Sequence, residues 1–142
     1  MDDCFGKFQF STDKERLCPR RIREMLSQNY WARNRTLEEV ETSIANSECF
    51  GVYDRDRQIG FARMVTDHAT VYWLCDVVID PAYRGQGLGT AFVKYIDESH
   101  PWRGLGILMS RDAQSLYRRF GYEPDNGTVM IRPASQRGGE DR

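Results

Sequence analysis

A short glycine-rich segment separates a strand pattern from a helix pattern in the middle of this chain. Residues 71–79 are a run of apolar, β-branched and aromatic residues, which predicts a strand. Apolar residues recur at helical spacing over residues 88–96, which predicts a helix with one apolar face. Glycine lets the backbone approach a ligand closely, and a helix start offers unpaired N–H groups with partial positive charge. Residues 80–90 therefore predict a phosphate-binding turn.

The spacing of the glycines in this turn excludes two common phosphate loops. A P-loop has Lys and then Ser or Thr after its last glycine, whereas here Thr90 follows Gly89 directly. The dinucleotide pattern is Gly-x-Gly-x-x-Gly, and this chain has Gly85-x-Gly87-x-Gly89. What remains is Arg84-x-x-Gly87-x-Gly89. Taken alone, this pattern fits an ordinary glycine-rich turn equally well.

Length and composition narrow the class of protein. A chain of 142 residues suits one domain, and 40% hydrophobic with 29% charged residues is typical of a soluble globular protein. The net charge of −1 indicates no nucleic-acid partner, and no apolar run reaches the roughly 20 residues of a membrane span. Four widely spaced cysteines and two histidines predict no metal site. An N-terminus without a signal-like core, together with free thiols, predicts a cytoplasmic protein.

The remaining patterns predict a mixed, mostly antiparallel sheet flanked by helices on both faces, which is an α+β fold. Thr36 and Glu39 form a capping box at the start of one helix. The expected strands are residues 8–12, 49–53, 59–65, 71–79, 105–109 and 129–131, and the expected helices are residues 19–26, 37–44, 88–99 and 113–120. We expect a single domain over residues 1–133 and a polar tail over residues 134–142.

A second motif follows the turn at residues 112–122, with the sequence Asp-Ala-Gln-Ser-Leu-Tyr-Arg-Arg-Phe-Gly-Tyr. It resembles the Ala-x-x-Leu-Tyr-x-x-x-Gly-Phe/Tyr signature of the GCN5-related N-acetyltransferase (GNAT) family. The earlier Arg84-x-x-Gly87-x-Gly89 resembles the acyl-CoA pyrophosphate loop of the same family. The resemblance covers element order, domain length and both motifs. One departure is Ser110, where many members carry Asn near the pantetheine arm.

The resemblance implies an N-acetyltransferase that uses acetyl-CoA as co-substrate and needs no metal. The acetyl group would pass directly to a primary amine of a small molecule or peptide. By resemblance, the backbone of Val77, Val78 and Ile79 would pair with the pantetheine arm in a splay opened by a strand bulge. The backbone of the turn would hold the pyrophosphate, through Arg84, Gly85, Gln86, Gly87, Leu88, Gly89 and Thr90.

Two residues are candidates for proton transfer. Tyr117 matches the tyrosine of the second motif, so the resemblance makes it the general acid that protonates the departing CoA thiolate. Helical periodicity alone favours a core aromatic at this position. Asp76 is a carboxylate inside an apolar strand, which needs a reason because burying an unpaired charge is costly. It is either a base that acts on the amine or the partner of an ion pair with an arginine such as Arg63.

The acceptor is the least determined part of the expected site. By resemblance, Tyr30 and Trp31 would line the sides of the acceptor pocket, and Phe61 and Arg63 would line its base. Aromatic walls suit a cationic amine, whereas Arg63 suits an acceptor carboxylate. Two other functions stay open: an acyl-CoA-binding module without catalysis, and acetylation of a Lys or N-terminus of a protein. A homodimer is also left open.

Overall fold

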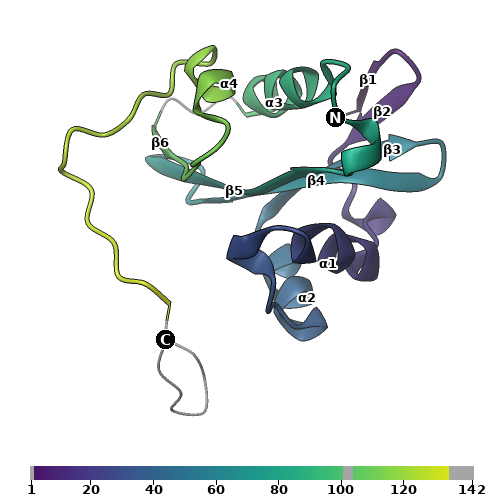
Figure 1. The fold of residues 1–142 in the computed structure, drawn as a ribbon, viewed down its shortest axis with the longest axis horizontal. Coiled ribbons are helices and arrows are strands. Elements are labelled where there is room, and N and C mark those ends of the chain that lie inside the picture. The colour runs from purple at the N-terminus through teal and green to yellow at the C-terminus, as the bar shows by residue number, and fades with distance from the viewer. Residues whose placement is uncertain (1, 101–103, 135–142) are drawn as a thin grey trace.

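The computed structural model describes residues 2–100 and 104–134. Figure 1 shows one curved sheet with helices on both of its faces. Its six strands lie in chain order: β1 (Asp3–Phe5), β2 (Phe8–Ser11), β3 (Glu48–Asp54), β4 (Arg57–Thr66), β5 (Val71–Ile79) and β6 (Leu105–Ile107). All neighbouring pairs are antiparallel except β5 and β6, which are parallel. The predicted α+β class is confirmed.

Two helices cover each face of the sheet (Figure 1). On one face, α1 (Pro19–Ser27) and α2 (Leu37–Ala45) pack their apolar sides over β4 and β5. Pro19 occupies the first turn of α1, and the predicted Thr36–Glu39 capping box is present at the start of α2. On the other face, α3 (Leu88–Glu98) and α4 (Gln114–Arg118) close the larger core cluster. The described residues also include three single turns of 3-10 helix: Lys14–Arg16, Tyr30–Ala32 and Pro81–Tyr83.

The structure differs from the expected strands in three places. β1 was not predicted, and β6 ends at Ile107 rather than residue 109. Residues 129–131 are not a strand, because no neighbouring strand pairs with them within the described ranges. The N-cap of α4 is Ala113, whose N–H donates to the Ser110 hydroxyl at 3.0 Å.

A bulge separates Ile59 from Phe61, although the two-residue period of a regular strand would put these residues on one face of the sheet. The register between β3 and β4 shifts between Val52 and Tyr53, so Ile59 is an extra residue in β4. Ile59 therefore packs in the cluster beneath α3, whereas Phe61 packs in the cluster beneath α1 and α2. The two-residue side-chain period does not hold across the bulge, because it applies only where the pairing of the strands is uninterrupted.

Candidate active site

The glycine-rich turn adopts a backbone conformation that glycine favours. Gly85 and Gly87 have φ of 84° and 79°, a conformation that residues with a Cβ rarely adopt. Gly87 is the N-cap of α3, and no side chain caps that helix start. A Cβ built on Gly85 or Gly89 would meet nothing within 4 Å, and one on Gly87 would meet only the ring of Phe5, at 3.8 Å. The turn is thus an exposed cradle of backbone N–H groups with room for a phosphate.

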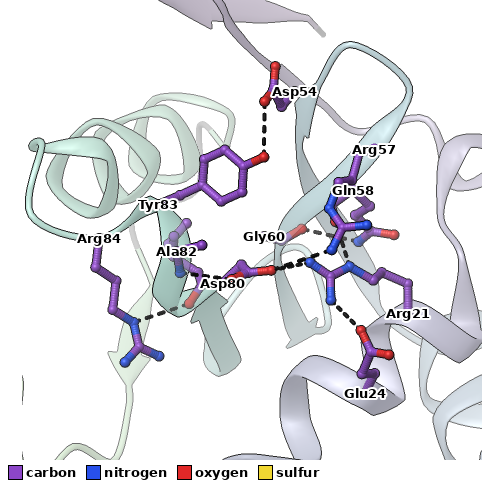
Figure 2. Close-up of polar contacts among 11 residues, drawn as sticks. Arg21, Glu24, Asp54, Arg57, Gln58, Gly60, Asp80, Ala82, Tyr83 and Arg84 are labelled. Atoms are coloured by element: carbon purple, nitrogen blue, oxygen red, sulfur yellow. Dashed lines mark hydrogen bonds and ion pairs between the residues drawn. The ribbon is translucent and has the colours of Figure 1, made fainter.

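Asp80 holds the start of this turn against the sheet and α1 (Figure 2). Its carboxylate accepts the Ala82 N–H at 2.9 Å and pairs with Arg21, while its own N–H donates to the Ile59 carbonyl. Arg21 also donates from Nε to the Gln58 carbonyl at 2.9 Å. Burial opposes the charge of Asp80, but these donors outweigh it and hold its pKa below the usual carboxyl range. No sequence pattern marks this anchor, because its partners are far apart in the chain.

The rest of the turn is fixed by contacts with the strand ends. The Tyr83 hydroxyl donates to the Asp54 carboxylate at 3.0 Å, and Arg84 Nε donates to the Ile79 carbonyl at 3.2 Å (Figure 2). Gln86 Nε2 donates to the Tyr83 carbonyl at 3.0 Å. These side chains brace the turn from its flanks and fix the conformation of its backbone.

β5 contains the bulge that the resemblance implied. Phe61 pairs with Val78 and Arg63 pairs with Cys75, so β5 has one residue more than β4 in this interval. Asp76 lies there with a φ of 56°. The pairing of β5 with β6 ends at Trp73 and Ile107, so the two parallel strands part before Val77–Ile79. The pairing therefore ends where the splay was expected, and the role of Val77–Ile79 in binding pantetheine stays a prediction.

Tyr117 lies on α4 and is largely buried in the core cluster above β5. Its ring packs edge-on against that of Tyr122 at a centroid distance of 6.0 Å, and the Tyr122 hydroxyl donates to the Tyr72 hydroxyl at 3.2 Å. Burial raises the pKa of Tyr117 to about 12. The phenol therefore keeps its proton at neutral pH. Its assignment as the general acid stays a prediction.

Asp76 is enclosed by two arginines. Its carboxylate accepts from Arg63 Nε at 2.7 Å and from Arg35 Nη1 at 2.5 Å, and its side chain is 3% exposed. Burial opposes the charge, but the hydrogen bonds and charges of Arg35 and Arg63 outweigh it and lower the pKa of Asp76. This geometry favours the ion-pair alternative. The role of Asp76 as a base stays a prediction, and Arg35 is a partner that the sequence analysis did not name.

The expected acceptor residues do not form one surface in this structure. Trp31 is exposed beside the start of α2, whereas Phe61 is buried in the core cluster beneath α1 and α2. Arg63 is engaged by Asp76 and by the Ser47 hydroxyl, which Arg63 Nη1 approaches at 3.3 Å. The side chain of Tyr30 lies outside the described part of the structure. The structure therefore joins Arg63 to Asp76, and Trp31 is exposed whereas Phe61 is not.

Other kinds of site find little support in the described residues. No group of three His, Cys, Asp or Glu side chains is placed to hold a metal ion among them. None of the helices in residues 2–100 and 104–134 is long and apolar enough to cross a membrane. Two open depressions of about 220 Å³ each lie near Lys14 and Glu48, and neither is lined by the turn or by α4.

Comparison with known proteins points to one family. The family described as acetyltransferase (GNAT) domain matches this chain over residues 45–124. A solved structure of a GNAT-family protein from Xanthomonas campestris pv. campestris is 34% identical with a TM-score of 0.82, covering 89% of this chain and 93% of that one.

Curated relatives match a shorter stretch. A Glycine max protein named histone acetyltransferase TAP1 is 39% identical over 75 residues, which is 51% of this chain and 32% of that protein. GCN5-related N-acetyltransferase 2, chloroplastic, from Arabidopsis thaliana is 36% identical over 98 residues, which is 63% of this chain and 38% of that protein. The chain thus spans about a third of the length of these relatives.

Proposed function

This chain belongs to the GNAT family of acetyltransferases, and from that premise we propose that it moves the acetyl group of acetyl-CoA to a primary amine. The acceptor is a small molecule or a peptide. The observation that carries the proposal is the glycine-lined start of α3, which directly follows the stretch of β5 that no longer pairs with β6. A pyrophosphate and an extended pantetheine arm need these two features side by side.

The proposed reaction is a direct transfer. The neutral amine attacks the thioester carbon, the C–N bond forms, and collapse of the tetrahedral intermediate breaks the C–S bond. Tyr117 gives its phenolic proton to the CoA thiolate, and the proton lost by the amine restores the phenol through solvent. A backbone N–H of Val77–Ile79 polarises the thioester oxygen, since the parting of β6 leaves this stretch of β5 without a parallel partner. An acid with a pKa of about 12 is protonated at the start of every cycle.

The cradle can be tested by replacing Gly87 with Val. The φ of 79° at this position strains a β-branched residue, and the added side chain occupies the space for the phosphate. We expect calorimetry to show acetyl-CoA binding at least about tenfold weaker, because several backbone donors lose their alignment. Gly127→Val is the matched control, since Gly127 has a φ of 99° in an exposed turn away from α3. Equal affinity in Gly87→Val and the wild type would show that the pyrophosphate binds elsewhere.

An acceptor screen tests the activity itself. The protein is mixed with acetyl-CoA and a panel of amines, and released CoA is measured as free thiol. We expect at least one amine class to raise thiol release far above the acceptor-free rate, and Gly87→Val to abolish that increase. If acetyl-CoA binds but no amine or peptide stimulates release, the chain is an acyl-CoA-binding module rather than a transferase.

A protein acceptor is the second candidate. It is supported by the name of the Glycine max relative, a histone acetyltransferase, and by the exposed setting of Trp31 next to the first helices. Lysine-bearing peptides and free small amines in the same screen distinguish the two. A higher kcat/KM for peptides than for the best small amine would favour the protein acceptor.

A further inference from the structure

Two arginines share a single carboxylate oxygen at the bulge of β5. Arg35 Nη1 and Arg63 Nε both donate to Oδ2 of Asp76, at 2.5 and 2.7 Å. Among the described residues, neither arginine forms another ion pair. Two positive charges thus face one negative charge, which leaves a net charge of +1 on these three side chains. We call the three residues the bulge cluster.

The surplus positive charge of the bulge cluster is partly withdrawn from water. The side chains of Asp76, Arg63 and Arg35 are 3%, 15% and 27% exposed. Water screens a charge in such a setting less than on an open surface, so an unbalanced charge there attracts a counterion strongly. The surplus of the cluster therefore favours an anionic ligand over a cationic one.

Arg35 is the member of the cluster with donors left for an anion. Arg63 already uses Nε for Asp76 and Nη1 for the Ser47 hydroxyl, at 3.3 Å. Arg35 uses only Nη1, and its Nε and Nη2 donate to no acceptor among the described residues. The N–H groups on the Nε and Nη2 edge of a guanidinium are parallel, and this edge matches the two oxygens of a carboxylate.

The bulge cluster lies on the sheet face that α1 and α2 cover. Arg35 belongs to the turn between these helices, and Arg23 Nε on α1 donates to its carbonyl at 3.2 Å. Asp76 directly precedes Val77–Ile79, the stretch of β5 that would polarise the thioester in the proposed reaction. Tyr117, the proposed acid at the sulfur, is on α4, which covers the opposite face with α3 (Figure 1). The face of the bulge cluster is therefore the one left for the acceptor.

We propose that the acceptor is a small amino-carboxylate, and that Arg35 binds its carboxylate through Nε and Nη2. This inference rests on the acetyl transfer proposed above and names its substrate class. One carboxylate balances the surplus charge of the bulge cluster, whereas an acceptor with a second cationic group meets a like charge. The amine lies within a few bonds of the carboxylate, so an acceptor held at Arg35 reaches the thioester beside Val77–Ile79.

Matched acceptors test the substrate class. Each pair consists of an amino acid and the amine that lacks only its carboxylate, such as β-alanine with ethylamine and γ-aminobutyrate with propylamine. Thiol release from acetyl-CoA gives kcat/KM for both members. We expect the better carboxylate member to exceed its partner at least about tenfold, because a charge-assisted hydrogen-bond pair is lost without the carboxylate.

Arg35→Gln tests the residue. Asp76 keeps Arg63 as its partner in this variant, so circular dichroism should show an unchanged fold. We expect kcat/KM for the carboxylate acceptor to fall at least about tenfold, while kcat/KM for the plain amine and the Kd for acetyl-CoA stay near those of the wild type. Arg35→Lys keeps the charge without the fork and should lie between the two. Arg33→Gln, at an exposed arginine outside the cluster, is the matched control.

Calorimetry reads the same contact without turnover. N-acetyl-β-alanine is titrated into the protein in the presence of CoA, and we expect binding that Arg35→Gln weakens about tenfold. Such binding supports the carboxylate site even where no amine stimulates thiol release, in which case the acetyl transfer alone fails. Plain amines that match or exceed their carboxylate partners would overturn the inference. So would a carboxylate preference that persists in Arg35→Gln, or no binding of the acetylated amino acid.

Discussion

Replacing Tyr117 with Phe is expected to lower kcat about tenfold to a few hundredfold while leaving the Kd for acetyl-CoA nearly unchanged. The ring is largely buried, and Phe retains its packing against Tyr122 and the core. What the variant loses is the proton, which the pKa of about 12 keeps on the phenol at neutral pH. The expected loss of kcat is limited because a thiolate is already a fair leaving group without protonation.

The kcat should be measured with the best acceptor from the screen, under conditions in which the chemical step limits the rate. Tyr122→Phe is the matched control, since it removes a partly buried hydroxyl from the neighbouring ring and its hydrogen bond to Tyr72. If both variants lose the same activity, the loss reflects packing of α4. An unchanged kcat in Tyr117→Phe would remove Tyr117 from the acid role.

Local signals predicted most of the fold. The Thr36–Glu39 capping box and the Pro19 helix start need only neighbouring residues, and both are present in the structure. The glycine-rich turn was predictable for the same reason. The turn needs positive φ angles, and Gly85 and Gly87 supply them within a few residues. The strand at residues 129–131 was wrong because strand formation depends on a partner, which propensity does not supply.

The site was less predictable where it depends on distant residues. Asp76 was recognisable as an unusual carboxylate, but one of its two partners, Arg35, is 41 positions away and carries no distinguishing pattern. Arg21 and Asp80 are 59 positions apart and form the anchor of the turn. Such pairs are set by the packing of α1 and α2 against the sheet, which a single sequence does not encode in its spacing.

Asp76→Asn is expected to destabilise the fold by about 3–5 kcal/mol, the usual cost of breaking a buried ion pair. Asn is the replacement that isolates the charge, because it tolerates the left-handed φ of 56° at this position. The amide cannot neutralise Arg35 and Arg63, which then face each other across the bulge without a counterion. Thermal or urea unfolding measures the loss, and Asp56→Asn, at an exposed carboxylate in the turn between β3 and β4, serves as the surface control.

The same variant separates the two roles of Asp76 through pH. Because the folded pKa of Asp76 lies below its ordinary value, its contribution to stability is present above the ordinary carboxyl pKa and is lost as pH falls through the folded one. The stability of Asp76→Asn should therefore fall less steeply in acid than that of the wild type. Since both arginines hold the carboxylate ionised and engaged, we expect the pH–rate profile of the folded variant to keep its wild-type shape. A rate that is low at neutral pH and recovers as pH rises, when more of the amine is already neutral, would instead make Asp76 the base.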